Sequence, residues 1–247
     1  MFAGYQRHLG ARLAEQWKVA AHFGQRWAET PLDTRRRWGR LRRFVASSAL
    51  SRAERYRTWA GVFSPEAIAV VSDGAGDGVK AVADIFHEVT HLDAVDAALA
   101  IDTRHYLPTD LLPKMDITTM MYSLEARSPL LDRELAEFVA RLPTSLKIKR
   151  WSTKYVLKKA LDGIIPSATV RRPKQGFAVP IGAWFRGELR VFLNDHLRHG
   201  HCAAAGIVRQ NGVDALLDAH GSGKADRSHE LWTVLMLELW YRECVAA

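Results

Sequence analysis

The sequence is poor in cysteine and has no long apolar run. Its 247 residues include only Cys202 and Cys244, too few for a disulfide framework, which favours a reducing compartment. No stretch approaches the roughly eighteen apolar residues of a transmembrane helix. The start of the chain lacks the apolar core of a signal peptide. These absences predict a cytoplasmic protein that does not contact a membrane.

The sequence also lacks the short motifs of several common enzyme sites. It has neither a Walker lysine loop nor a GxGxxG sequence that opens a helix, and no serine stands in a nucleophile elbow. The loop from Asp73 to Gly78 offers too few side-chain oxygens for an EF-hand. Local motifs of these kinds therefore leave the chemistry open.

Positive charge is concentrated near the N-terminus. The chain carries 35 Lys and Arg against 27 Asp and Glu, a net charge of +8, and most of the excess lies before residue 44. The arginine-rich stretch 35–43 is typical of phosphate attraction, but no base-reading module accompanies it. We therefore expect a solvated basic helix face, or one that meets an acidic partner surface, and no nucleic-acid partner. A non-catalytic basic binding module remains an alternative.

Apolar residues recur at helical spacing along most of the chain, and strand patterns are few. Ser64-Pro65-Glu66 predicts a helix start, with serine as the cap and proline in the first turn. We expect a mainly α fold, with an N-terminal helical segment over 1–100 that has a basic face and a C-terminal region over 101–247, together forming one continuous domain. The expected helices are 6–29, 33–60, 79–100, 153–161 and 228–245.

His87-Glu88-Val89-Thr90-His91 matches the pattern of zinc peptidases, in which two histidines one helical turn apart bind zinc and the glutamate acts as a base. It lies within the helix expected over 79–100. Against it, the chain holds ten histidines, and no glutamate that would supply a third ligand occurs between Glu88 and Glu125. A zinc metallopeptidase is therefore only an alternative function, and we assign no metal ligand.

A second group of metal-binding residue types occurs further along the chain, at His196, His199, His201 and Cys202. Its spacing matches no closed zinc site with a second ligand pair. We expect a polar loop there.

Longer sequence patterns are more specific. Residues 102–116 resemble the D-x-x-x-Y-L-P-x-D-L-L-x-K-x-D signature of the glutamine-hydrolysing asparagine synthetase family, and residues 123–132 resemble its S-L-E-x-R-S-P-x-L-D sequence. The resemblance covers most of the chain. Other matching residues follow in the family's order, namely Leu142-Pro143, Lys147, Thr153-Lys154-Tyr155, Pro166, the stretch 172–177, Pro180, Trp184, Gly187-Glu188-Leu189 and the stretch 231–240, while Phe2-Ala3-Gly4-Tyr5 resembles a turn earlier in the family.

This resemblance implies a fold and a reaction. The fold is the helical C-terminal portion of an ATP-pyrophosphatase-type (adenine nucleotide hydrolase-like) α/β synthetase domain. The reaction is that of an ATP-dependent amidotransferase and ligase, in which aspartate is activated as an acyl-adenylate and then amidated in asparagine biosynthesis. The implied cofactors are ATP and magnesium. Relatives that form other amides share these motifs, so the substrate is aspartate or a related carboxylate.

The resemblance also implies roles for particular residues. Lys154 and Glu125 are the expected catalytic residues, because a lysine neutralises the departing diphosphate and a glutamate handles protons or orients the substrate. Arg127 and Ser123 are expected to bind the substrate. Lys114 and Asp116 are expected near the cofactor. Two alternatives stay open, a structural ion pair between Glu125 and Arg127 and an exposed helix lysine at Lys154.

The sequence departs from the family at several places. It lacks the S-G-G-x-D-S loop that cradles diphosphate and the aspartate-rich loop that holds magnesium. Phe2 follows Met1 where the family has its glutaminase cysteine, and Ile117 replaces an arginine. We therefore expect a chain that is inactive alone and exposes apolar surface. That surface would be covered by a separate chain carrying the missing half of the domain or by self-association.

Overall fold

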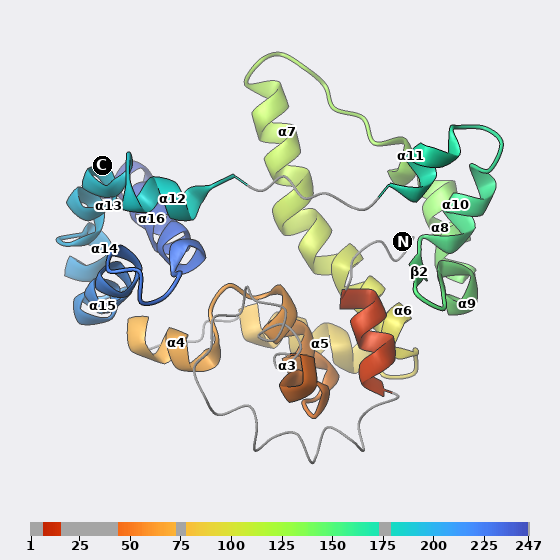
Figure 1. Ribbon diagram of the computed structural model, residues 1–247, viewed down its shortest axis with the longest axis horizontal. Helices are drawn as coiled ribbons and strands as arrows, with labels where there is room; N and C mark the ends of the chain where they lie inside the picture. The colour runs from red at the N-terminus through yellow and green to blue at the C-terminus, as the bar shows by residue number, and fades with distance from the viewer. Residues whose placement is uncertain (1–6, 16–43, 73–77, 173–178, 247) are drawn as a thin grey trace. The chain divides into compact units, whose positions relative to one another are not determined.

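The computed structural model describes residues 7–15, 44–72, 78–172 and 179–246. These residues are mainly helical, as expected, and their strands form a single two-stranded hairpin (Figure 1). The chain divides into two compact units. Unit 1 comprises residues 1–30, 37–59 and 79–174, and unit 2 comprises residues 31–36, 60–78 and 175–247. The division at residue 100 and the ATP-pyrophosphatase-type fold both stay predictions.

Unit 1 contains the segments that carry the family signature. Helical segments at 7–15 and 44–48 precede its labelled elements. These are α3 (Arg52–Ala60), α5 (Gly78–Glu88), α6 (Ala94–Ile101), the π-helix η2 (Asp102–Leu111), α7 (Leu112–Met120), the 3-10 helix η3 (Pro129–Leu131), α8 (Arg133–Arg141), α9 (Thr144–Lys147), β1 (Ile148–Lys149), β2 (Ser152–Thr153), α10 (Tyr155–Ala160) and α11 (Ser167–Arg171).

Helix α6 forms the centre of unit 1. Most of its residues are buried, and they belong to three neighbouring hydrophobic clusters, because an almost wholly apolar helix is stable only when it is covered on several sides. The side chain of Asp93 caps its N-terminus by accepting hydrogen bonds from the amides of Val95 and Asp96. This cap begins a new helix, so the single helix expected over 79–100 is wrong. Instead, α5 ends at Glu88 and a turn leads to α6.

The signature segment 102–111 forms a π-helix that continues from α6 and leads directly into α7. Pro108 lies inside this helix, where its ring nitrogen has no hydrogen to donate to the preceding turn. A wider helical turn tolerates such an interruption, and π-helical turns are frequent at functional sites. The segment thereby directs α7 away from α6 (Figure 1).

Unit 2 is a group of helices around α16. Val234 and Leu235 of α16 share a buried cluster with Leu193 and Leu217. The helix expected over 228–245 is confirmed as α16, and the start expected at Ser64 is confirmed, since its hydroxyl accepts a hydrogen bond from the Ala67 amide. The elements are α4 (Pro65–Val71), α12 (Ile181–Arg186), α13 (Arg190–Leu197), α14 (His201–Ala204), α15 (Gln210–Gly221) and α16 (Ser228–Cys244).

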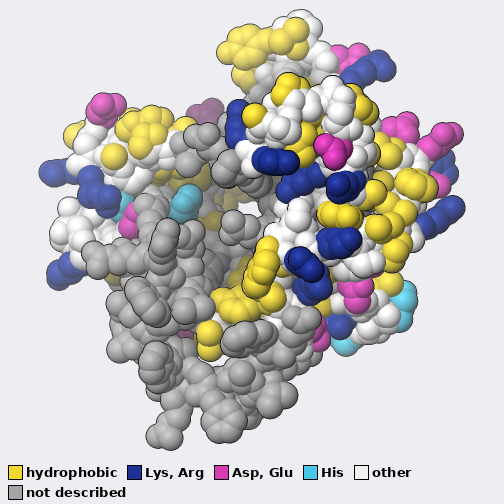
Figure 2. All heavy atoms as spheres, turned by 45° about the vertical axis from the view of Figure 1, so that its right-hand side comes forward, with side chains coloured by type: hydrophobic (Ala, Val, Ile, Leu, Met, Phe, Trp, Pro, Cys, Tyr) yellow, Lys and Arg dark blue, Asp and Glu magenta, His cyan; other side chains and the backbone are white. Residues whose placement is uncertain are grey.

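Several large apolar side chains of unit 1 are exposed on α7 and on the segment that follows it. Figure 2 shows hydrophobic side chains on the surface, with Lys and Arg side chains between them. Exposed apolar surface agrees with the expectation above, whereas the protein that would cover it stays a prediction. No helix within the described ranges is long and apolar enough to cross a membrane. The exposed residues include Met115, Ile117, Met120, Met121, Tyr122 and Leu124.

Candidate functional site

Lys154 lies at the junction between the hairpin and α10. Strands β1 and β2 are antiparallel, with Ile148 paired to Thr153, and Lys154 follows Thr153 directly. Its backbone adopts φ 55° and ψ 35°, and α10 begins at the next residue. The alternative that Lys154 is an exposed lysine within a helix is therefore wrong about the helix, although it is right about the exposure. Lys154 precedes the helix, and its side chain is exposed.

The left-handed backbone of Lys154 is unusual for a residue with a side chain. Among the described residues, only Ser123, Arg150 and Lys154 have a positive φ without being glycine. An L-residue in this conformation is strained by about 1–2 kcal/mol, and strain of this kind concentrates at functional sites. Two of the three, Ser123 and Lys154, are residues that the family resemblance assigned to the site.

The surroundings of Lys154 are rich in uncompensated positive charge. The sequence has no carboxylate between Glu137 and Asp162. Lys149 lies over the ring of Tyr155 at 4.8 Å and donates to its hydroxyl at 3.2 Å, and Lys158 Nζ lies 3.5 Å from Ser152 Oγ. Within the described part of the chain, neither Lys149, Lys154 nor Lys158 pairs with a carboxylate. Cations left unneutralised in this way attract phosphate groups.

Glu125 and Arg127 form an ion pair in the segment between α7 and η3. The Arg127 Nη2 atom lies 2.8 Å from Glu125 Oε1, and Arg127 Nε donates to the same oxygen at 3.0 Å. Both side chains are largely exposed, at 82% for Arg127 and 67% for Glu125. An exposed pair contributes at most about 1 kcal/mol to stability, so its effect on folding is small.

The other three expected site residues lie on α7 and just beyond it. Lys114 and Asp116 are exposed on α7, and Lys114 Nζ lies 3.7 Å from Asp110 Oδ1. Ser123 is exposed in the segment that connects α7 to η3. Of the six expected residues, the structure places only Glu125 and Arg127 in direct contact.

A buried polar centre around Asp102 was not identified from the sequence. Its carboxylate accepts hydrogen bonds from Arg7 at 2.7 Å and from Tyr56 at 2.5 Å, and it lies 2.6 Å from His8 Nε2. The Arg7 guanidinium also lies over the ring of Tyr106, 4.7 Å from its centroid. Asp102 and Tyr106 are the first two fixed residues of the signature. Through their contacts with Arg7 and His8, they hold the helix at 7–15 against η2.

The pKa values in this centre shift with burial and hydrogen bonding. Burial alone would raise the pKa of Asp102, but hydrogen bonds from His8, Tyr56 and Arg7 outweigh it and lower that pKa. Burial, followed by the hydrogen bond to Asp102, raises the pKa of Tyr56 far above its usual value. Burial also lowers the pKa of His8. Asp102 is therefore a stable anion with fixed donors.

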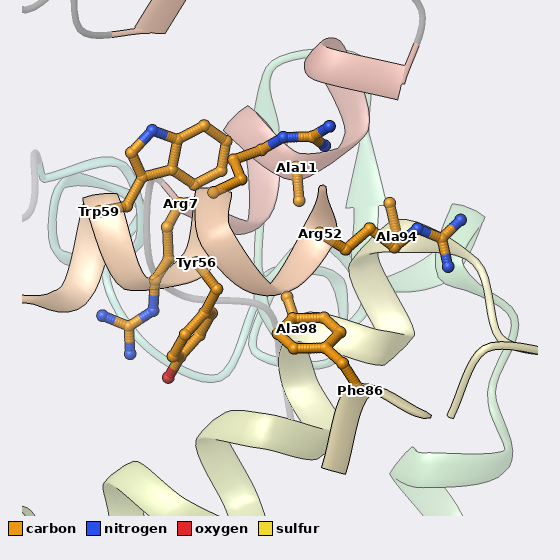
Figure 3. Close-up of a pocket in the computed structure, with 9 residues that line it drawn as sticks. Arg7, Ala11, Arg52, Tyr56, Trp59, Phe86, Ala94 and Ala98 are labelled. Carbon is orange, nitrogen blue, oxygen red and sulfur yellow. The ribbon is translucent and has the colours of Figure 1, made fainter. Parts of the chain in front are cut away.

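A small cavity lies beside this centre (Figure 3). Its volume is about 20 Å³, room for about one water molecule and too little for a nucleotide. Its arginines already have partners, because Arg7 bonds Asp102, and Arg52 and Arg55 each lie 3.3 Å from Glu15. We therefore assign it no ligand. It is lined by Arg7, Ala11, Arg52, Arg55, Tyr56, Trp59, Phe86, Ala94 and Ala98.

The zinc-peptidase motif does not have the required geometry. His87 lies in the last turn of α5, whereas His91 lies in the turn beyond it, so the expectation that both share one helix is wrong. Glu88 is paired with Arg104 at 2.6 Å. The described residues include no group of three or more His, Cys, Asp or Glu side chains arranged to hold a metal ion.

The second histidine group is the expected polar loop only at His199, which is exposed in the turn between α13 and α14. His196 lies in α13, where its Nδ1 contacts the Phe192 carbonyl at 2.8 Å. His201 and Cys202 open α14, and Cys202 is buried in the core of unit 2. The amides of both residues donate to the buried carboxylate of Glu238. This arrangement fixes the start of α14.

Other sequence predictions lie outside the described residues. They concern the arginine-rich stretch 35–43, residues 16–29 of the helix expected over 6–29, residues 33–43 of the helix expected over 33–60, the loop at 73–77, and the stretch 173–177 of the family pattern. The basic binding module is therefore neither supported nor tested by geometry. The described part of the expected helix 33–60 forms two helices, at 44–48 and 52–60, with a turn between them, so the single helix is wrong.

A family model and curated relatives of the chain point to the same family. The model of the family described as asparagine synthase matches residues 1–242. A Mycobacterium bovis protein, provisionally named a glutamine-hydrolysing asparagine synthetase, is 40% identical over 160 residues, which are 64% of this chain and 24% of that protein. Glutamine-hydrolysing asparagine synthetase 1 of Bacillus subtilis is 33% identical over 156 residues, 63% of this chain and 24% of that protein. The matched region thus spans about a quarter of the length of these relatives. No solved structure matches the chain significantly.

Proposed function

Because the chain belongs to the asparagine synthase family, we propose that it contributes to an ATP-dependent site that activates a carboxylate for amide formation. The substrate is aspartate or a related acid, and the product belongs to asparagine biosynthesis or to a similar amidation. A carboxylate oxygen of the acid attacks the α-phosphorus of ATP, and the bond to the departing diphosphate breaks. The nitrogen of ammonia then attacks the acyl carbon, and AMP leaves.

The observation that carries this proposal is the position of Lys154. It is an exposed cation at the end of a hairpin, in a stretch without carboxylates, and its backbone is held in the left-handed region. Negative charge grows on the oxygen between the α- and β-phosphorus atoms as diphosphate departs. A fixed ammonium beside that oxygen stabilises the transition state more than the bound ATP. Lys149 and Lys158 add to the local positive potential.

The remaining residues serve the acid and the nucleotide. Arg127 binds a carboxylate of the substrate through its planar guanidinium, and Ser123 donates a hydrogen bond from its hydroxyl. Glu125 holds Arg127 in place and accepts a proton from the attacking ammonia. Lys114 and Asp116 on α7 contact the nucleotide.

Magnesium is the family's usual companion of ATP, and it enters such reactions bound to the substrate phosphates. The stretch of sequence around Lys154 does not fit a magnesium site, since it supplies no carboxylate ligand between Glu137 and Asp162. We therefore assign the neutralisation of diphosphate by this part of the chain to Lys154, and no step to a metal ligand.

The proposal is tested by binding of inorganic diphosphate to the full chain, measured by calorimetry for wild type, Lys154→Ala and the matched control Lys149→Ala. We expect Lys154→Ala to weaken binding by about tenfold or more, because a charge-assisted contact is lost, and Lys149→Ala to weaken it far less. Equal effects of the two substitutions, or no binding by the wild-type chain, would overturn the role of Lys154.

A second measurement follows the chemistry. Aspartate-dependent exchange of labelled diphosphate into ATP reports adenylation, and Lys154→Ala is expected to slow it by about 10²–10³-fold wherever the complete site supports exchange. Unaltered exchange in Lys154→Ala would contradict a transition-state role.

A further inference from the structure

Seven residues before Lys154, the side chain of Lys147 is buried, which is rare for lysine. It is only 2% exposed, and its Nζ atom lies 2.7 Å from Asp96 Oδ1 and donates to the Ala140 carbonyl at 3.1 Å. Burying a lysine is costly unless it is paired, and an apolar side chain of similar size fills such a space as well. Packing alone therefore does not account for a charged group at this position.

The acceptor of this lysine lies on the central helix of unit 1. Asp96 lies in the first turn of α6, whose N-terminus is capped by Asp93. The Thr144 hydroxyl donates to Asp96 Oδ2 at 3.1 Å and also contacts the carboxylate of Asp93. The pair therefore joins the segment around α9 to the central helix through charge-assisted hydrogen bonds, which are stronger and more directional than apolar contacts.

A short path leads from Lys147 to Lys154. Ile148, the next residue, is fully buried against Val95 and Leu99, and its carbonyl accepts a hydrogen bond from Arg12 at 3.2 Å. Ile148 is paired with Thr153 across the hairpin. Lys147 and Lys154 are thus the outer neighbours of the same strand pair. A hairpin of two residue pairs has little stability of its own, so its position depends on what anchors its first strand.

We propose that the buried pair of Lys147 and Asp96 positions Lys154 for contact with phosphate. Lys147 is a positioning residue: it touches no substrate and acts through Ile148, Thr153 and the entry to α10. The inference rests on the proposed function, because it assumes that Lys154 contacts phosphate. Lys147 is paired with Asp96 in the interior and holds the hairpin in place, whereas Lys154 remains an exposed cation that can contact phosphate.

The test uses the full chain and inorganic diphosphate as the probe. Lys147→Met keeps the length of the side chain and removes its charge. Asp96→Asn is the milder variant, because its amide oxygen still accepts from Lys147. We expect Lys147→Met to weaken diphosphate binding to the level of Lys154→Ala, and Asp96→Asn to weaken it less. Hydrogen exchange of residues 148–157 should rise in the same order.

The control Val82→Ala distinguishes a general loss of stability from a displacement of Lys154. It truncates a buried residue in a different cluster of unit 1. All measurements are made well below the melting temperature of each variant. The positioning role requires that Val82→Ala lowers the melting temperature without weakening diphosphate binding. If Lys147→Met does not fold at the working temperature, Asp96→Asn and Val82→Ala alone decide the comparison.

The outcomes distinguish this inference from the proposed function. If Lys154→Ala weakens binding but Lys147→Met and Asp96→Asn leave it unchanged, positioning is overturned and the proposed function stands. If Val82→Ala weakens binding as much as the two positioning variants, the effect is one of general stability and the inference is likewise overturned. If Lys154→Ala has no effect, the proposed function and this inference both fail.

Discussion

The Tyr56 hydroxyl donates a hydrogen bond of 2.5 Å to Oδ1 of Asp102, although the two residues are 46 positions apart in the sequence. Arg7 donates to the same oxygen from a position 95 residues away. Both partners reach Asp102 at the start of η2. One carboxylate therefore links the helix at 7–15, α3 and η2, and we expect the stability of unit 1 to depend on it.

Removal of this carboxylate should destabilise the chain strongly. Asp102→Ala removes a buried carboxylate that accepts from Arg7 and Tyr56, and we expect a loss of about 3–5 kcal/mol in the free energy of unfolding. Tyr56→Phe removes one hydrogen bond and should cost about 1–3 kcal/mol. Denaturant titration followed by circular dichroism measures both. Asp110→Ala, an exposed change in the same π-helix, is the control and should cost no more than about 0.5 kcal/mol. Similar values for Asp102→Ala and Asp110→Ala would contradict the role of this centre.

The split between α5 and α6 gives a prediction about metal binding. Since His91 lies beyond the end of α5 and Glu88 pairs with Arg104, we expect the purified chain to hold far less than one zinc ion per molecule. Elemental analysis measures this ratio. The thermal stability of His87→Ala should be insensitive to a chelator, as that of the wild type should be. Stoichiometric zinc that is lost on His87→Ala would restore the metallopeptidase hypothesis.

The two cysteines should differ sharply in reactivity. Burial, followed by the hydrogen bond to Glu238, raises the pKa of the Cys202 thiol to about 11, whereas Cys244 is exposed. Thiolate is the reactive form, so a disulfide reagent at pH 8 should label Cys244 alone in the native chain and both cysteines in denaturant. Absorbance of the released thiolate counts them. Cys244→Ser should abolish the native reaction, and rapid labelling of that variant would show that Cys202 is accessible.

Glu238 should make unit 2 sensitive to acid. Burial alone would raise the pKa of Glu238, but hydrogen bonds from the Cys202 and His201 amides and from Arg242 lower it to about 2. A carboxylate whose pKa is lowered by folding stabilises the native state above its ordinary pKa, near 4.5, and this contribution is lost as the pH falls towards 2.

Glu238→Gln tests this directly. At pH 7 we expect it to lose about 1–3 kcal/mol, because the buried donors keep a weaker acceptor. The difference in unfolding free energy from the wild type should narrow between pH 4.5 and 2, since the wild type loses its carboxylate contribution there. Glu243→Gln, an exposed change on the same helix, should show no such trend. A difference that stays constant over this range would rule out the titration of Glu238 as its cause.

Local sequence determined several parts of this protein. The Ser64-Pro65 start of α4 and the long helix α16 are encoded by short stretches of sequence, because caps and helical periodicity depend on near neighbours. The mainly α fold follows from the same patterns. The family followed from the ordered motifs over residues 102–132, which required no structure.

Tertiary structure decided what depends on residues that are distant in the chain. The pairing of Arg7 and Tyr56 with Asp102, the break at Asp93 and the burial of Lys147 against Asp96 leave no periodic pattern in the sequence. The left-handed backbone of Lys154 is equally invisible there, because lysine has no preference for it. The sequence named the chemical groups and their helices; long-range burial and hydrogen bonding determined which charges are neutralised in the interior and which remain available at the surface.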